Sequence, residues 1–171
     1  MSEFDDNKKM GKAMMWIAWG LFFVLMFWFF QGVLQKQHNP NQQPQMNLTQ
    51  DGRSEVTLER NRFGHYLTNG SINGSDVVFL LDTGATNVSI PASLADNLNL
   101  PIMGYHYVQT ANGSVQVQQT EIAELSIGNI ILYNVAANIN PGMKTNEILL
   151  GMSALKQLDF SQSGKYLTLT Q

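Results

Sequence analysis

The residues best suited to chemistry lie in one short segment, where an acidic side chain follows a run of apolar ones. Residues 77–81 are all apolar, and Asp82 follows them directly, with Thr83, Gly84 and Ala85 behind it. An ionised carboxylate at the inner end of an apolar strand is costly unless amides, hydroxyls or a second charge compensate it. Asp82 is therefore a candidate for acid–base chemistry.

Two interpretations of Asp82 follow from this segment alone. The side chain could serve only a turn, by accepting a hydrogen bond from a backbone amide two residues on. Gly84 suits such a turn because glycine can adopt backbone angles closed to other residues. The apolar run before the acid and the features downstream favour the catalytic interpretation.

Residues 80–86 read Leu-Leu-Asp-Thr-Gly-Ala-Thr, which resembles the active-site signature of the aspartic proteases. In its one-copy form the segment is similar to the retropepsin-like family, and the resemblance covers about residues 63–169. It implies an all-β fold, a closed retropepsin-like (acid protease) β-barrel with one or two short helices. It also implies that Asp82 is catalytic and that Thr83, Gly84 and Ala85 support the catalytic loop.

A polar hairpin follows the Asp82 segment. Residues 105–110 and 115–122 alternate in polarity as strands do, and they flank a short tip. The resemblance implies that this hairpin is a flap that closes over bound peptide. Without the Asp82 segment before it, the pattern would indicate an ordinary exposed hairpin. The substrate-binding residues implied at the tip are Ala111, Asn112 and Gly113.

A second element of the family pattern lies near the C-terminus. Residues 147–150 predict a short strand that runs into Gly151, where a helix begins at once. The resemblance implies that Gly151 lets two backbones pack closely beneath the catalytic loop. A plain strand-to-helix turn is the alternative. Gly151 and Ser153 superficially suggest a serine-hydrolase elbow, but Leu155 stands where that motif needs glycine.

A single Asp-Thr-Gly in the chain predicts that two chains are needed for catalysis. Peptide hydrolysis by carboxylates needs one oxygen to accept a proton from water and another, protonated, to donate one. Two adjacent carboxyls that share one proton supply both roles. We therefore expect a homodimer in which Asp82 of each chain faces its mate. By the resemblance, Thr83 would bond across the interface.

Several elements must position Asp82. Residues 77–81 predict a strand buried on both faces, and Asn73-Gly74 before them is a strong hairpin signal. Asp82 should thus end the second strand of a hairpin. A brief strand at 87–90 and a short helix starting at Pro91 should follow it. Further strands are predicted at 55–59, within 123–139 and at 166–169.

The N-terminal part of the chain predicts a membrane anchor. Residues 13–34 are almost entirely apolar, which matches the roughly 20 residues that span a bilayer as a helix. Lys8, Lys9 and Lys12 precede them, so the positive-inside rule places residues 1–12 in the cytoplasm and the rest outside. Residues 35–53 are rich in Gln, Asn and Pro and predict a flexible polar linker. The protease domain is then residues 54–171.

Composition excludes several other classes of site. The chain has no cysteine, and its three histidines lie far apart, so no metal and no cofactor is expected. A net charge of −3 gives no reason to expect nucleic acid as a partner. Five Asn-x-Ser/Thr triplets, two of them in the catalytic segment and the flap tip, favour a compartment without N-glycosylation, such as a periplasm.

These observations together predict a single-pass inner-membrane protein with a periplasmic or other extracytoplasmic C-terminal domain. Its expected activity is that of a homodimeric aspartic endopeptidase acting on extended polypeptide, which would bind as an added strand. One alternative is a non-catalytic peptide-binding or dimerisation module on the same fold. Another is a monomeric β-domain whose lone acid could not hydrolyse a peptide.

Overall fold

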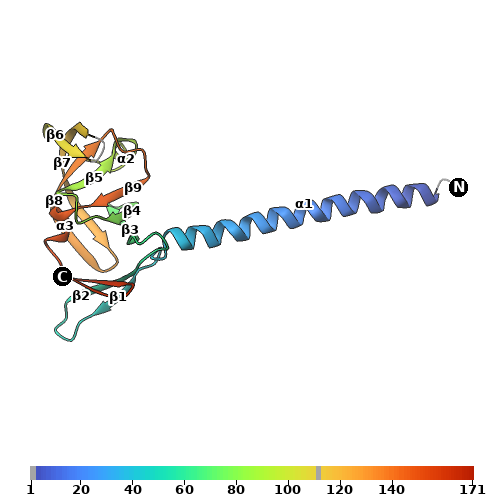
Figure 1. Ribbon diagram of the computed structural model, residues 1–171, viewed down its shortest axis with the longest axis horizontal. Coiled ribbons are helices and arrows are strands. Elements are labelled where there is room, and N and C mark those ends of the chain that lie inside the picture. The colour runs from blue at the N-terminus through green and yellow to red at the C-terminus, as the bar shows by residue number, and fades with distance from the viewer. Residues whose placement is uncertain (1–2, 111–112) are drawn as a thin grey trace. The chain divides into compact units, whose positions relative to one another are not determined.

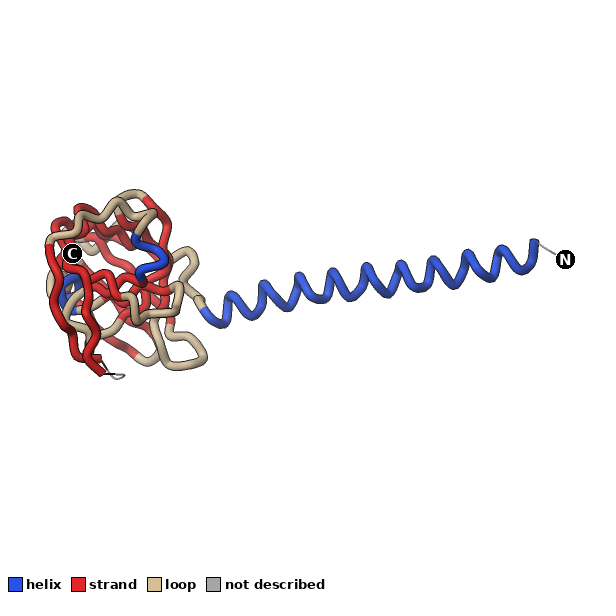
Figure 2. The backbone as a smooth tube through the Cα atoms, turned by 90° about the horizontal axis from the view of Figure 1, so that it is seen from above, coloured by secondary structure: helices blue, strands red, loops and turns tan. Residues whose placement is uncertain are grey.

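The computed structural model describes residues 3–110 and 113–171. The chain divides into two compact units, Met1–Gln37 and His38–Gln171. Strands make up most of the second unit, and its helices are two short turns (Figure 2). The expectation of a β fold with one or two short helices after an N-terminal helix is confirmed.

The N-terminal helix, α1, spans Glu3–His38. Its segment Met14–His38 is long and apolar enough to cross a membrane, by length and composition. The large apolar side chains of this segment are exposed, and its aromatic rings contact one another, as Trp19 does with Phe22 and Phe23. The helix thus runs four residues further than the predicted 13–34 and ends where the second unit begins.

A seven-stranded sheet holds the candidate site (Figure 1). Its order is β3-β4-β9-β5-β8-β7-β6, and β3 also pairs with β7 over two residues. That second pairing brings the ends of the sheet together, but β5 and β9 share only one pair, Ser89 with Leu149. The predicted closed barrel is therefore correct in outline, although closure is incomplete. Its strands are β3 (Leu67–Ile72), β4 (Ser75–Leu81), β5 (Val88–Pro91), β6 (Gly104–Thr110), β7 (Gly113–Ile127), β8 (Ile130–Asn140) and β9 (Glu147–Leu150).

A second sheet has four antiparallel strands in the order β1-β2-β11-β10. Figure 1 labels two of them, β1 and β2, at the end of the unit opposite β6. Its two central strands were predicted, but its outer strands were not. The apolar side chains of β2 and β11 that join the core are Val56, Leu58, Leu167 and Leu169. The four strands are β1 (Gln45–Leu48), β2 (Ser54–Glu59), β10 (Asp159–Ser163) and β11 (Tyr166–Thr170).

Residues 38–53 correct the prediction of a flexible linker. Asn41 is buried, and its side-chain amide donates to the carbonyl oxygens of Glu59 and Leu67 at 2.9 and 2.6 Å. Its side-chain oxygen accepts from the Glu59 amide at 2.7 Å. Asn39 is buried beside it and donates to the Asn69 side chain. Composition predicted disorder because these residues bury little apolar surface, but their hydrogen bonds hold the segment to the domain.

The hairpin of β3 and β4 agrees with the sequence. Asn73 and Gly74 both have positive φ, 49° and 81°, which is the geometry of the two-residue turn that Asn-Gly favours. The prediction that residues 77–81 are buried on both faces is wrong. Only Phe79 is fully buried. The other four side chains are partly buried, and Leu81 also lines an open cavity.

Two short helices follow strands of the large sheet. α2 spans Ala92–Ala95. Pro91 was predicted as the first residue of this helix, but it is the N-cap, so the helix begins one residue later than predicted. α3 spans Met152–Leu155, with Gly151 at its N-cap. The strands predicted at 115–122 and at the start of 123–139 are one continuous strand, β7. Gly128, with a φ of 59°, makes the turn into β8.

Candidate active site

Asp82 lies directly after β4, between two strands that fix its backbone. β4 pairs with β3 on one side and runs parallel to β9 on the other, with Leu81 opposite Leu150. The Asp82 amide continues this pairing by donating to the Leu150 carbonyl oxygen at 3.1 Å. The carboxylate is thus attached to the middle of the large sheet, while its side chain stays partly exposed.

The turn after Asp82 matches the geometry of an Asx turn. The Gly84 amide donates to Asp82 Oδ1 at 2.9 Å, and the Ala85 amide donates to the Asp82 carbonyl oxygen at 3.2 Å. The φ of Gly84 is not positive, so the expected reason for glycine is wrong. A Cβ at this position would instead lie 3.2 Å from Asp82 Oδ1. Glycine therefore leaves room for the close approach of the carboxylate, which any larger residue would push aside by a few tenths of an ångström.

The start of α3 holds the other end of the same loop. The amides of Met152 and Ser153 donate to the carbonyl oxygens of Ala85 and Thr86 at 2.8 and 2.9 Å. Gly151 makes this contact possible. A Cβ at Gly151 would lie 2.7 Å from the Ala85 carbonyl oxygen, and it would also meet the backbone of Asn87. The loop from 82 to 87 is therefore clamped between β9 and α3.

Ser153 has a structural position that the sequence did not indicate. Its hydroxyl donates to the Ala136 carbonyl oxygen of β8 at 2.7 Å and accepts from the Val88 amide of β5 at 3.0 Å. Because the side chain is buried, these bonds link three elements beneath the Asp82 segment. This role is consistent with the dismissal of a serine-hydrolase elbow.

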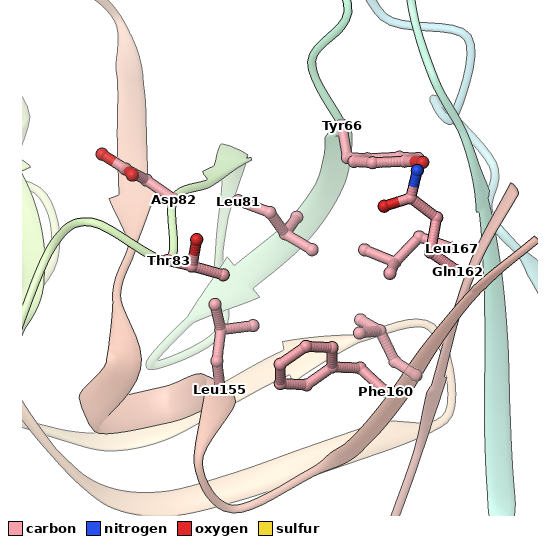
Figure 3. Close-up of a pocket in the computed structure, with 9 residues that line it drawn as sticks. Tyr66, Leu81, Asp82, Thr83, Leu155, Phe160, Gln162 and Leu167 are labelled. Atoms are coloured by element: carbon pink, nitrogen blue, oxygen red, sulfur yellow. The ribbon is translucent and has the colours of Figure 1, made fainter. Parts of the chain in front are cut away.

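A cavity of about 360 Å³ lies beside Asp82. Figure 3 shows Asp82 and Thr83 on one side of it and Tyr66 with Gln162 on the other, with apolar side chains between them. The Asp82 carboxylate lies at the edge of the cavity and points away from its apolar centre. The Tyr66 hydroxyl is buried and has no hydrogen-bond partner among the described residues. The remaining lining residues are Leu81, Leu155, Phe160, Leu167 and Leu169.

Sequence reasoning missed most of this cavity. Its lining comes from β4, α3, β10, β11 and the residue before β3, which are far apart along the chain. Phe160 and Gln162 lie on β10, which is exposed along its whole length and carries no alternating pattern. Tyr66 could have been singled out only as an aromatic residue before a strand. Apolar periodicity alone gave no signal that these residues meet next to Asp82.

The hairpin that was predicted to act as a flap forms from β6 and β7, with Tyr105 opposite Gln118 and Thr110 opposite Gly113. Gly113 has a φ of 110° and begins β7. The other two residues predicted to bind substrate, Ala111 and Asn112, lie outside the described residues. Within the described part of the chain, no three His, Cys, Asp or Glu side chains come together as metal ligands would.

This arrangement, an Asp-Thr-Gly turn clamped between a strand and a glycine-led helix, agrees with a known family. Residues 68–157 match the family described as "gag-polyprotein putative aspartyl protease". The chain belongs to the retropepsin-like aspartyl protease family. The match covers the two parallel strands that hold Asp82, the hairpin predicted as a flap, and α3.

Two curated proteins are similar to this chain in sequence, and both are described as uncharacterized. An uncharacterized protein of a Sinorhizobium species is 34% identical over 115 residues, which are 66% of this chain and 49% of that protein. An uncharacterized protein of Rickettsia prowazekii is 27% identical over 109 residues, which are 60% of this chain and 45% of that protein. The chain thus spans about half the length of the curated relatives it matches.

A solved structure gives the same fold. The crystal structure of a retropepsin-like aspartic protease from Rickettsia conorii matches with a TM-score of 0.58 and 23% sequence identity. The match covers 74% of this chain and 93% of that chain. The predicted retropepsin-like fold is thereby confirmed.

Proposed function

We propose that the protein is a membrane-anchored, homodimeric aspartic endopeptidase that cleaves extended polypeptide, with Asp82 as its catalytic residue. Membership of an aspartyl protease family supports a peptide-bond hydrolase. The observation that carries the proposal is the position of Asp82. Its carboxylate is partly exposed, oriented by the Gly84 amide, and placed at the edge of an apolar cavity.

The requirement for two chains follows from the chemistry. Among the described residues, the cavity beside Asp82 is lined by no second acidic side chain. One carboxylate alone cannot both accept a proton from water and donate a proton to the substrate in the same step. Asp82 of a second chain, placed across a twofold axis, supplies the missing group. Thr83, which is exposed next to Asp82, is the neighbour best placed to bond across that axis.

In the proposed reaction the two Asp82 carboxyls share one proton. The ionised carboxylate accepts a proton from a water molecule while the water oxygen bonds to the carbonyl carbon of the peptide. The protonated carboxyl donates its proton to the carbonyl oxygen, which gives a tetrahedral diol. The diol breaks down when a diol hydroxyl returns its proton and the leaving nitrogen receives one, so that the C–N bond breaks. The products are a carboxylic acid and an amine, with the two carboxyls again sharing one proton.

Extended polypeptide is the substrate class that suits this fold. β6 is the last strand of the large sheet and pairs only with β7 among the described residues. A peptide lying under the β6–β7 hairpin would gain backbone hydrogen bonds as an added strand does. In this proposal Gly113, with Ala111 and Asn112, contributes to binding at the hairpin tip. Folded proteins should be poor substrates because their backbone groups are already paired.

The proposed location is the inner membrane, with the catalytic domain outside the cytoplasm. The apolar segment Met14–His38 is the observation that supports an anchor. Lys8, Lys9 and Lys12 before it favour a cytoplasmic N-terminus. Anchoring would confine the chains to two dimensions and so raise their effective concentration for pairing.

The test uses the full chain in lipid vesicles with an unstructured protein as substrate. We expect wild type to cleave it and Asp82→Asn to lose about 10²–10⁴-fold in rate, because the acid–base group is gone. Asp76 is an exposed acid on β4, the strand that precedes Asp82. Asp76→Asn is therefore the matched control and should cleave normally. A pepstatin-type inhibitor should block wild type. Cleavage that survives Asp82→Asn, or wild type that cleaves nothing, would contradict the proposal and favour a non-catalytic module.

A further inference from the structure

A short loop between β2 and β3 holds an exposed aromatic ring in a fixed position. Asn61, which is buried, organises the loop: its side-chain oxygen accepts from the amides of Phe63 and His65 at 2.9 and 3.0 Å. The Asn61 amide donates to the His65 carbonyl oxygen at 2.8 Å, and Gly64 completes the turn with a φ of 90°. The loop is thus a hydrogen-bonded structure with its apolar residue turned outward.

Phe63 is the residue that this turn presents to the outside. Its side chain is 57% exposed, and the Arg62 guanidinium lies over the ring, with 4.5 Å from Cζ to the ring centroid. The ring thus presents an apolar surface to water beside a positive charge. A single exposed ring is common on protein surfaces, so Phe63 gains meaning only from its position in the chain and from the charges around it.

The loop lies next to the residue where the candidate membrane span ends. The Asn61 side-chain amide donates to the His38 carbonyl oxygen at 2.9 Å, and His38 is the last residue of the span. Asn39, the next residue, is already buried in the domain. If the chain leaves the bilayer at His38, the loop that is hydrogen-bonded to His38 lies at the level of the lipid headgroups.

The charge of the loop is positive. Arg60 and Arg62 are exposed, and residues 60–65 contain no acidic side chain. The nearest acid along the chain, Glu59, is paired with Lys165 at 2.8 Å. A pair of arginines beside an aromatic ring complements a membrane surface, where phosphate groups lie above an apolar layer.

We propose that the loop Arg60–Asn61–Arg62–Phe63–Gly64–His65 docks onto anionic phospholipid, with Phe63 inserted among the headgroups and the arginines on their phosphates. The proposal rests on the membrane anchor of the proposed function. It extends that function, because docking holds the catalytic domain at the bilayer surface. The substrates within reach are then polypeptides that emerge at, or lie on, the membrane.

The absence of cysteine makes a direct test possible. A single cysteine introduced by Phe63→Cys in the full chain can carry a nitroxide spin label, and Tyr133→Cys is the matched control because Tyr133 is also 57% exposed. Ala18→Cys reports whether the span itself is in lipid. Collision rates with oxygen, which concentrates in lipid, and with a water-soluble nickel chelate are measured in vesicles of phosphatidylcholine with and without phosphatidylglycerol.

We expect labels at 18 and 63 to favour oxygen, and the label at 133 to favour nickel. Adding Arg60→Glu changes the charge of the loop by two units and should lower the ratio of docked to undocked loop by about 25-fold, at about fivefold for each unit, whereas Arg60→Lys should leave the ratio unchanged. The docking proposal would be overturned, and the anchor kept, if the label at 18 lay in lipid while the label at 63 were as accessible to nickel as the label at 133. Equal docking in vesicles without phosphatidylglycerol would overturn the proposed preference for anionic phospholipid, because phosphatidylcholine has a phosphate but no net charge. A label at 18 that is open to nickel would overturn the anchor as well.

Discussion

The backbone amide of Met152 donates a hydrogen bond of 2.8 Å to the carbonyl oxygen of Ala85. This bond joins the loop after Asp82 to the first residue of α3, although the two residues are far apart in sequence. The position of the carboxylate therefore depends on how closely the strand-to-helix turn at Gly151 can approach the loop. Changes at that turn should affect the candidate active site without touching Asp82.

Gly151→Ala tests this dependence. The added Cβ would meet the carbonyl oxygens of Ala85 and Asn87, and neither backbone can yield without moving the loop. We expect a loss of about 1–3 kcal/mol in unfolding free energy and a larger loss of activity than stability alone explains. Thermal unfolding and cleavage of an unstructured protein measure the two effects.

Gly104→Ala is the control for that substitution. Its Cβ would have only the Gln119 side chain nearby, at 3.9 Å, and the φ of Gly104 is not positive. This variant should fold and cleave as wild type does. If Gly151→Ala behaved in the same way, the clamp on the catalytic loop would be unimportant.

Ser153→Ala should destabilise the domain although its hydroxyl has no catalytic role. The substitution leaves the buried Val88 amide and Ala136 carbonyl without their partner. We expect a cost of about 1–3 kcal/mol, measured by denaturant unfolding. Ser161→Ala, on the exposed strand β10, should cost little in the same assay. Equal stability of the two variants would mean that the Ser153 bridge contributes nothing.

Asn41→Asp should release the segment that was expected to be a linker. The Asn41 side-chain amide donates to two carbonyl oxygens. In Asn41→Asp a carboxylate oxygen, which can only accept, would lie against both carbonyl oxygens. We expect a loss of about 2–5 kcal/mol and faster hydrogen exchange at the Glu59 amide. Asn47→Asp, at an exposed position on β1, is the matched control. Unchanged exchange in Asn41→Asp would show that the segment is held by other contacts.

Mixing chains tests the need for two copies of Asp82. If each active unit contains one Asp82 from each chain, and chains pair at random, an equal mixture of wild type and Asp82→Asn contains about one quarter wild-type pairs. Activity per total chain should then fall to about one quarter of the wild-type value once the chains have exchanged. A fall to one half would show that each chain works by itself.

Local signals were enough to predict the position of Asp82. The Asn73-Gly74 turn and the apolar run that follows both act over a few residues, and β4 forms where they indicate. The strand-to-helix turn at Gly151 was predictable for the same reason. The resemblance then related these elements to one another, which periodicity alone could not do.

Other features depend on contacts that leave no local pattern. Strand β10 is exposed at every residue, so neither alternation nor burial distinguishes it from a loop. Asn41 belongs to a segment whose composition indicates disorder, and only its hydrogen bonds to Glu59 and Leu67 show otherwise. The cavity beside Asp82 was missed because five separate parts of the chain build it.

The length of β7 has a mechanical consequence. Residues 113–117 pair only with β6 among the described residues, whereas the rest of the strand is fixed by β8 and, at 125 and 126, by β3. The first third of β7 thus projects with β6 from the part of the strand that β8 holds, without a break in β7 itself. If the proposed substrate binds beneath this hairpin, its entry would require bending of paired strands, so the stiffness of the two strands would set the rate of entry.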